Sequence, residues 1–207
     1  MSKTDEDLIN SARCAGKGHE EGLDLIPQQV EDGLKSEKWT VRLAWVKRTD
    51  WTPTPMQVER GLTNKVHIVR CAWVKRTDWT PTSEQVERGL SDSEVDVRLA
   101  WIDRLDWKAA HEQAERGLND PDSWIRLAWA ERHDFTPTLE QIERGLNDPS
   151  PYIRKARAGR QDFIPTNKQI ERLLNDPSRE VRDAWIGRLE VEQERLLYSG
   201  HSLEVSL

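Results

Sequence analysis

The sequence predicts an all-α protein, a right-handed α-solenoid of six two-helix repeats with a cap at each end. A strict internal period is the first reason. Equivalent positions, 28 residues apart, are filled by Gly33, Gly61, Gly89, Gly117, Gly145 and Leu173. A helix-start signal and a helical spacing of apolar residues inside each repeat are the second and third reasons. A unit of two short helices cannot bury its apolar face alone, so the repeats must stack on one another.

The period also divides the chain. Residues 24–190 contain the six repeats and are expected to form one solenoid domain. The acidic segment 1–23 is predicted to cap the N-terminal end. In the segment 191–207, the stretch around "EVEQERLLY" is predicted to extend the last helix as a C-terminal cap, and the final residues form a loose tail.

The first helix of each repeat, helix A, is expected to begin at a "TPT" motif such as Thr52-Pro53-Thr54. A hydroxyl N-cap followed by proline in the first turn is a helix-start signal. Val58 and Leu62 then lie four residues apart on one face. Gly61 lies on the same side. Because a glycine inside a helix costs about 1 kcal/mol relative to alanine, it indicates the close approach of a neighbouring helix.

The second helix, helix B, has the pattern "xVRxAWxxR". On a helical wheel Ala44, Trp45 and Arg48 fall within about 60° of Val41, which predicts a core stripe with an arginine at its edge. In the later repeats an aspartate followed by proline is predicted to form the N-cap of helix B, at Asp120, Asp148 and Asp176.

Charged residues recur at equivalent positions, which we call columns. The arginine columns begin at Arg42 and Arg48, and acidic columns contain Asp50 and Glu59. Stacked arginines could grip phosphate groups. A residue that every repeat needs is better explained by packing, however, so these columns are interpreted as ion pairs that set the stacking of the repeats.

The chain contains ten tryptophans, and most of them fall in two further columns that begin at Trp45 and Trp51. Such aromatic columns could stack nucleic-acid bases or sugars. Their helical core spacing favours core filling instead. Trp39 and Trp124 lie outside both columns and are predicted to be exposed.

An aspartate followed five and six positions later by a branched apolar residue and an arginine resembles HEAT-type repeats, at Asp92/Val97/Arg98, Asp120/Ile125/Arg126, Asp148/Ile153/Arg154 and Asp176/Val181/Arg182. The resemblance covers about residues 24–190. It implies that this aspartate and arginine face neighbouring repeats. The unit is shorter than usual for that family, and helix A lacks its interior proline. The stretch "DPSPYIRKARAGRQDFIPT" is also similar to the leucine-rich repeat variant. Both families imply a solenoid used mainly for interactions.

Composition argues against several classes of protein. The net charge is −6, which is not the profile of a nucleic-acid binder, although residues 39–90 carry +4. No apolar run approaches the roughly 18 residues of a membrane span, and the acidic start does not resemble a signal peptide. Cys14 and Cys71 form no CxxC pair, which favours a reducing, cytoplasmic location.

The sequence contains no arrangement of residues typical of an enzyme. The five histidines have no ligand-like spacing with one another or with the cysteines. Phosphate-binding glycine loops and the common hydrolase motifs do not occur. We therefore expect no catalytic residues, no metal and no cofactor.

Positions that differ between repeats, on the face of helix B opposite the core, are the candidate partner-binding residues. An apolar strip with a polar rim is typical of a binding surface. The alternative is that the leucine column only packs between adjacent helices B. The predicted set is Leu43, Lys47, Ile68, Cys71, Lys75, Leu99, Asp103, Trp124, Leu127, Glu131, Tyr152 and Lys155.

These observations predict a non-catalytic solenoid that binds another protein or a peptide on a concave helix-B face, as an adaptor, inhibitor or immunity-type module. One alternative is a nucleic-acid-binding HEAT-like protein or DNA glycosylase, which would need a basic groove. Another is a structural scaffold. Charged end helices disfavour end-to-end stacking, so a monomer is expected.

Overall fold

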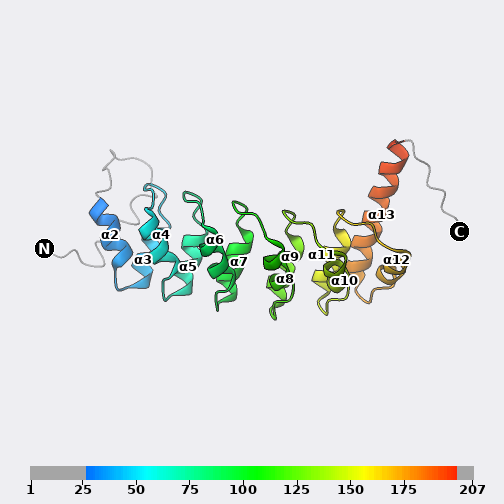
Figure 1. Cartoon of the computed structure of the whole chain (residues 1–207), viewed down its shortest axis with the longest axis horizontal. Helices are drawn as coiled ribbons and strands as arrows, with labels where there is room; N and C mark the ends of the chain where they lie inside the picture. The colour runs from blue at the N-terminus through cyan, green and yellow to red at the C-terminus, as the bar shows by residue number, and fades with distance from the viewer. Residues whose placement is uncertain (1–26, 200–207) are drawn as a thin grey trace. The chain divides into compact units, whose positions relative to one another are not determined.

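The computed structural model describes residues 27–199, in which twelve α-helices and no strands occur (Figure 1). The helices form six pairs, and this confirms the predicted all-α solenoid of two-helix repeats. Labels follow Figure 1 and begin at α2. The predicted capping segment 1–23 and the residues after Ser199 lie outside the described part of the chain.

The chain divides into two compact units after Trp107. In unit 1, three pairs of helices A and B follow one another, coloured blue to green in Figure 1: α2 (Pro27–Lys35) with α3 (Trp39–Val46), α4 (Pro55–Leu62) with α5 (His67–Val74), and α6 (Ser83–Leu90) with α7 (Val95–Asp103).

Unit 2 repeats the arrangement. Its pairs are α8 (His111–Leu118) with α9 (Ser123–Glu131), α10 (Leu139–Leu146) with α11 (Pro151–Gly159), and α12 (Asn167–Leu174) with α13 (Arg179–Ser199). Helix α13 is far longer than the other helices B, which confirms the predicted helical extension past residue 190. Its role as a cap stays a prediction, as does the single-domain interpretation of residues 24–190.

Each helix A packs against helix B of its own repeat. Within a unit, successive helices B also contact one another, as α3, α5 and α7 do, whereas helices A of neighbouring repeats contact one another much less. The helices B therefore approach more closely than the helices A.

Helix A begins two residues later than the sequence predicted. The N-cap of α4 is Thr54, the second threonine of the motif, and not Thr52. Its hydroxyl accepts a hydrogen bond from the N–H of Gln57, and the Gln57 side chain accepts one from the N–H of Thr54, at 3.3 and 2.8 Å. This reciprocal capping box satisfies two backbone donors, whereas a single cap would satisfy only one. The same pair occurs in α6, α10 and α12.

The predicted N-caps of helix B were also wrong. Helix α9 is capped by Asp122, two residues after Asp120, and α11 begins after Ser150, two residues after Asp148. The Asp120 carboxylate instead accepts a hydrogen bond from the N–H of Asp122, at 2.9 Å. This arrangement shapes the turn and leaves the aspartate of the column able to reach a neighbouring repeat.

At the centre of each repeat that has both residues, the tryptophan of helix B packs against the glycine of helix A. Trp45, Trp73, Trp101, Trp129 and Trp185 are all buried, which confirms core filling for this column. A Cβ atom added at Gly61 would overlap the indole ring of Trp73, and the same holds in the neighbouring repeats. The glycine thus permits the close approach that the sequence predicted. The partner is helix B of the same repeat.

Candidate binding surface

Arginines of the Arg42 column link adjacent repeats in both units. In unit 1, Nε and Nη2 of Arg70 donate to the two carboxylate oxygens of Asp92, at 2.8 and 2.7 Å. The equivalent bidentate pairs of unit 2 are Arg126–Asp148 and Arg154–Asp176. The hydrogen bonds from Arg154 hold the pKa of Asp176 below its usual range. These arginines are therefore committed to stacking.

The Arg48 column serves the same purpose through the backbone. Arg76 pairs with Asp78 two residues later, and its Nη1 donates to the carbonyl oxygens of Val46 and Arg48 in the preceding repeat, both at 2.6 Å. Its guanidinium also lies 4.3 Å from the centroid of the Trp51 ring. One side chain thus satisfies carbonyl groups at the end of the previous helix B.

A third set of polar contacts joins the helices A of adjacent repeats. Glu31 of α2 accepts hydrogen bonds from Gln57 and Arg60 of α4, and this holds the pKa of Glu31 at about 2, with Arg60 the largest cause. Glu59, Glu115 and Glu143 contact the next helix A in the same way. The interpretation of the charged columns as links between repeats is confirmed. The alternative that the arginine columns grip phosphate is disfavoured at Arg70, Arg76, Arg126 and Arg154, which are already paired with aspartates.

In unit 1 the predicted binding residues fall into two kinds. Leu43, Cys71 and Leu99 are half-buried, and the first two pack against the core, as the packing alternative predicted. The exposed members are Lys47, Ile68, Lys75 and Asp103. The half-buried residues of the leucine column therefore lie at the edge of the surface. The exposed residues Lys47, Ile68, Lys75 and Asp103 provide its accessible atoms.

Lys75 and Asp103 meet at one pocket of unit 1. It has a volume of about 560 Å³ and is lined by the C-terminal ends of α5 and α7. Leu105, which is 80% exposed, also lines it. This leucine was not predicted. It follows helix B in the arginine-to-aspartate turn, where the other repeats of unit 1 hold Thr49 and Thr77, so an apolar residue in an otherwise polar turn of this unit was the available signal.

Cys71 is unsuited to thiolate chemistry. Burial is the largest cause that raises the pKa of its thiol, and the carboxylate of Asp96 adds to the effect. A protonated, half-buried thiol behaves as a small apolar side chain.

In unit 2 the structure brings aromatic residues to the surface. Trp124 and Tyr152 occupy equivalent positions in the first turns of α9 and α11, helices that pack side by side, and they are 60% and 64% exposed. Leu127 is half-buried, while Glu131 and Lys155 are exposed. The prediction that Trp39 and Trp124 are exposed is confirmed.

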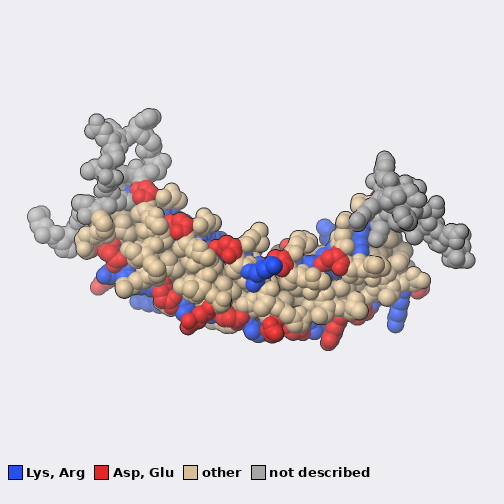
Figure 2. Space-filling model, turned by 45° about the horizontal axis from the view of Figure 1, so that its top comes forward, with Lys and Arg blue, Asp and Glu red and all other residues tan. Residues whose placement is uncertain are grey.

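No described residues form a group of three or more His, Cys, Asp or Glu side chains suited to a metal ion. None of the described helices could cross a membrane. On the face shown in Figure 2, acidic and basic side chains are interspersed. That face therefore lacks the continuous basic stripe typical of a nucleic-acid groove.

A family model of HEAT repeats associated with sister chromatid cohesion matches residues 139–156, which comprise α10 and part of α11. The match and the repeated helix pairs support a HEAT-like helical repeat family. Comparison with curated proteins finds no match.

Proposed function

We propose that the chain is a non-catalytic module that binds a protein or peptide on the exposed face of its helices B. The observation that carries the proposal is the exposed aromatic pair of unit 2, Trp124 and Tyr152. Both stand on helices whose other faces are fixed in the core by Ile125 and Ile153. Tryptophan and tyrosine on a rigid support are the side chains that most often dominate the energy of protein interfaces.

The arrangement of the helices supports the same face. Because helices B approach one another more closely than helices A, their first turns present neighbouring side chains at short range. A ligand lying across α9 and α11 can contact both aromatic rings at once. Exposed Lys155 follows Tyr152 by one helical turn, and exposed Glu131 lies at the C-terminal end of α9, and both add polar groups to this face.

The charged columns favour a protein ligand over a nucleic acid. A nucleic-acid binder of this kind would use stacked arginines to contact phosphates. Here Arg70, Arg126 and Arg154 are engaged by aspartates of the adjacent repeat. The HEAT-like match is in keeping with an interaction module, since such repeats generally mediate protein interactions.

The test is a partner captured from native lysate, identified by mass spectrometry, purified and titrated calorimetrically. The Trp124→Ala/Tyr152→Ala variant should bind at least about 30-fold more weakly, because each hot-spot aromatic is worth about 2 kcal/mol. Leu139→Ala/Ile164→Ala is the matched control. Leu139 and Ile164 are more exposed than the aromatic pair, at 79% and 88%, but neither lies on a helix B of the chain.

Circular dichroism establishes that both double variants remain folded. Equal binding by the wild type and the aromatic variant, with loss in the control, would place the interface elsewhere. Recovery of nucleic acid alone, with an affinity that falls steeply with salt, would replace the proposal with the nucleic-acid alternative.

A further inference from the structure

The inter-repeat arginine–aspartate pair is interrupted at one place in unit 1. Successive repeats carry Ser36, Asn64, Asp92, Asp120, Asp148 and Asp176 at the position of the aspartate. Arg70 pairs with Asp92, but Arg42 of the first repeat faces Asn64. Asn64 keeps the local role of the column, because its side-chain oxygen accepts a hydrogen bond from the N–H of Val66 at 3.0 Å. It supplies no carboxylate to Arg42.

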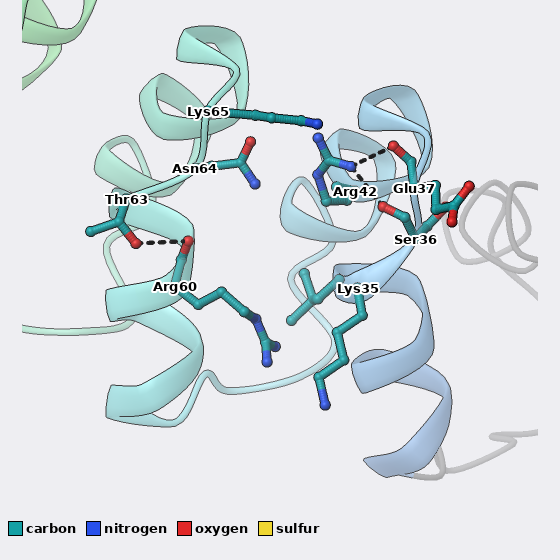
Figure 3. Close-up of a pocket in the computed structure, with 9 residues that line it drawn as sticks. Lys35, Ser36, Glu37, Arg42, Arg60, Thr63, Asn64 and Lys65 are labelled. Carbon is teal, nitrogen blue, oxygen red and sulfur yellow. Dashed lines mark hydrogen bonds between the residues drawn. The ribbon is translucent and has the colours of Figure 1, made fainter.

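Arg42 is buried without that partner. The residue is only 8% exposed, and its Nε atom has no hydrogen-bond partner among the described residues. Its Nη1 atom donates to the carbonyl oxygens of Ser36 and Glu37, at 2.6 and 2.8 Å, so the guanidinium is held in a fixed orientation (Figure 3). In the next repeat, the Nε edge of Arg70 is the edge that receives a carboxylate. A buried charged donor left unpaired is costly.

An accessible pocket adjoins this arginine. It has a volume of about 680 Å³ and lies between the first two repeats, lined by Arg42, Asn64 and the residues shown in Figure 3. A different cavity that includes Arg70 and Asp92 has a volume of only about 10 Å³ and is lined by core residues such as Trp101. The junction that lacks the carboxylate therefore has room for a ligand.

The pocket carries an excess of positive charge. Of its four basic residues, Arg60 and Lys35 both pair with Glu31, at 3.1 Å. Lys65 is exposed and makes no hydrogen bond or ion pair with the described residues. Figure 3 shows the Lys65 side chain extending from the α4–α5 turn towards Arg42. Glu37 also lines the pocket, so its wall contains four basic residues and one acidic residue. Arg42 and Lys65, the first of them fixed, form a favourable environment for an anion.

We propose that this pocket binds an oxyanion, a phosphate or carboxylate group, beside Arg42. An oxygen of the anion accepts a hydrogen bond from Nη2 of Arg42. The Lys65 ammonium closes over the anion from the opposite repeat. Nη2 of Arg70 donates to a carboxylate oxygen of Asp92 in the same way in the adjacent repeat. The inference is independent of the protein-binding function proposed above, because the pocket involves none of the residues of that surface.

The test is calorimetric titration of the full chain with inorganic phosphate and, separately, with acetate at low ionic strength. The Asn64→Asp variant restores the internal carboxylate and should weaken anion binding at least tenfold. It should also raise the midpoint of thermal unfolding, because Arg42 gains the partner that Arg70 has. Tighter binding of phosphate would indicate a phosphorylated ligand, and tighter binding of acetate would indicate an acidic side chain or a chain terminus.

Ser91→Asp is the matched control. It makes the same change in net charge on the exposed turn one repeat later, outside the pocket, and should leave binding within about threefold of wild type. Binding of neither anion at millimolar concentration would overturn the proposal. Equal loss in both variants, or unchanged binding in Asn64→Asp, would overturn it as well.

Discussion

Two neighbouring repeats of unit 2 fill the same position with opposite chemistry. In the pair α8 and α9, Trp129 lies on Gly117, buried, with its ring 6.0 Å from that of Phe135. In the pair α10 and α11, the equivalent Arg157 lies on Gly145 and is 0% exposed. The first side chain is suited to this space, and the second brings a charge into it.

Arg157 is poorly compensated. Its Nε, Nη1 and Nη2 atoms have no hydrogen-bond partner among the described residues. Burial is the largest cause that lowers its pKa, to about 10, and the nearby Arg160 adds to the effect. The side chain is therefore still cationic at neutral pH. The links between repeats are intact on both sides of Arg157. They hold the stack together despite an unfavourable residue at its centre.

The largest expected effect comes from replacing Arg157 with the tryptophan that the neighbouring repeats have at this position. Arg157→Trp should raise the free energy of unfolding by about 1–4 kcal/mol, because replacement of an uncompensated buried charge by a well-packed apolar side chain is often stabilising. Urea denaturation measures the change. Arg157→Leu separates loss of the charge from the fit of the indole ring. A decrease in stability for both variants would show that Arg157 contributes favourably where it stands.

A smaller effect should distinguish the two glycines beneath these side chains. A Cβ at Gly117 would overlap the rigid indole of Trp129, whereas a Cβ at Gly145 would lie 2.5 Å from Cγ of the flexible Arg157. Gly117→Ala should therefore be less stable than Gly145→Ala by about 1–3 kcal/mol, the usual cost of overpacking. The gain in helix propensity is common to both variants and cancels. Equal unfolding midpoints would contradict the packing account of the glycine column.

The smallest effect concerns pH. Acid should lower the stability of wild type and of Arg157→Trp by the same amount. Interaction with Arg172 is the largest cause that lowers the pKa of Glu143, from 4.5 to about 2. The unfolded state therefore binds more protons between these pH values, so stability is present above about pH 4.5 and is lost as the pH falls towards 2. Arg157 does not titrate in this range. The stability difference between wild type and Arg157→Trp should stay constant between pH 7 and pH 4 in urea titrations, and a difference that grows in acid would show that a carboxylate such as Asp162 stabilises the Arg157 cation.

Several features of the candidate surface could be read from the sequence. Trp124 and Tyr152 were identified because they differ from the other residues of their column, and their exposure follows from helical spacing alone. The division of the leucine column between core and surface could not be predicted, because a half-buried side chain depends on the distance to the next helix B. The Arg42 pocket had a signal in the sequence, Asn64 in a column of aspartates. The column was interpreted as helix caps and, through the HEAT resemblance, as contacts to neighbouring repeats, but Asn64 was not singled out.

The sequence by itself determined the repeat, the pairing of helices and the identity of the core, because a fixed period forces each buried column to meet its own copy in the next unit. Tertiary structure alone decided which charges find partners. A wheel of one helix shows Arg42, Arg70 and Arg154 as equivalent, and only the neighbouring repeat supplies a carboxylate to two of them and leaves the third beside an open pocket. Such differences arise between repeats, where local spacing contains no information about distance.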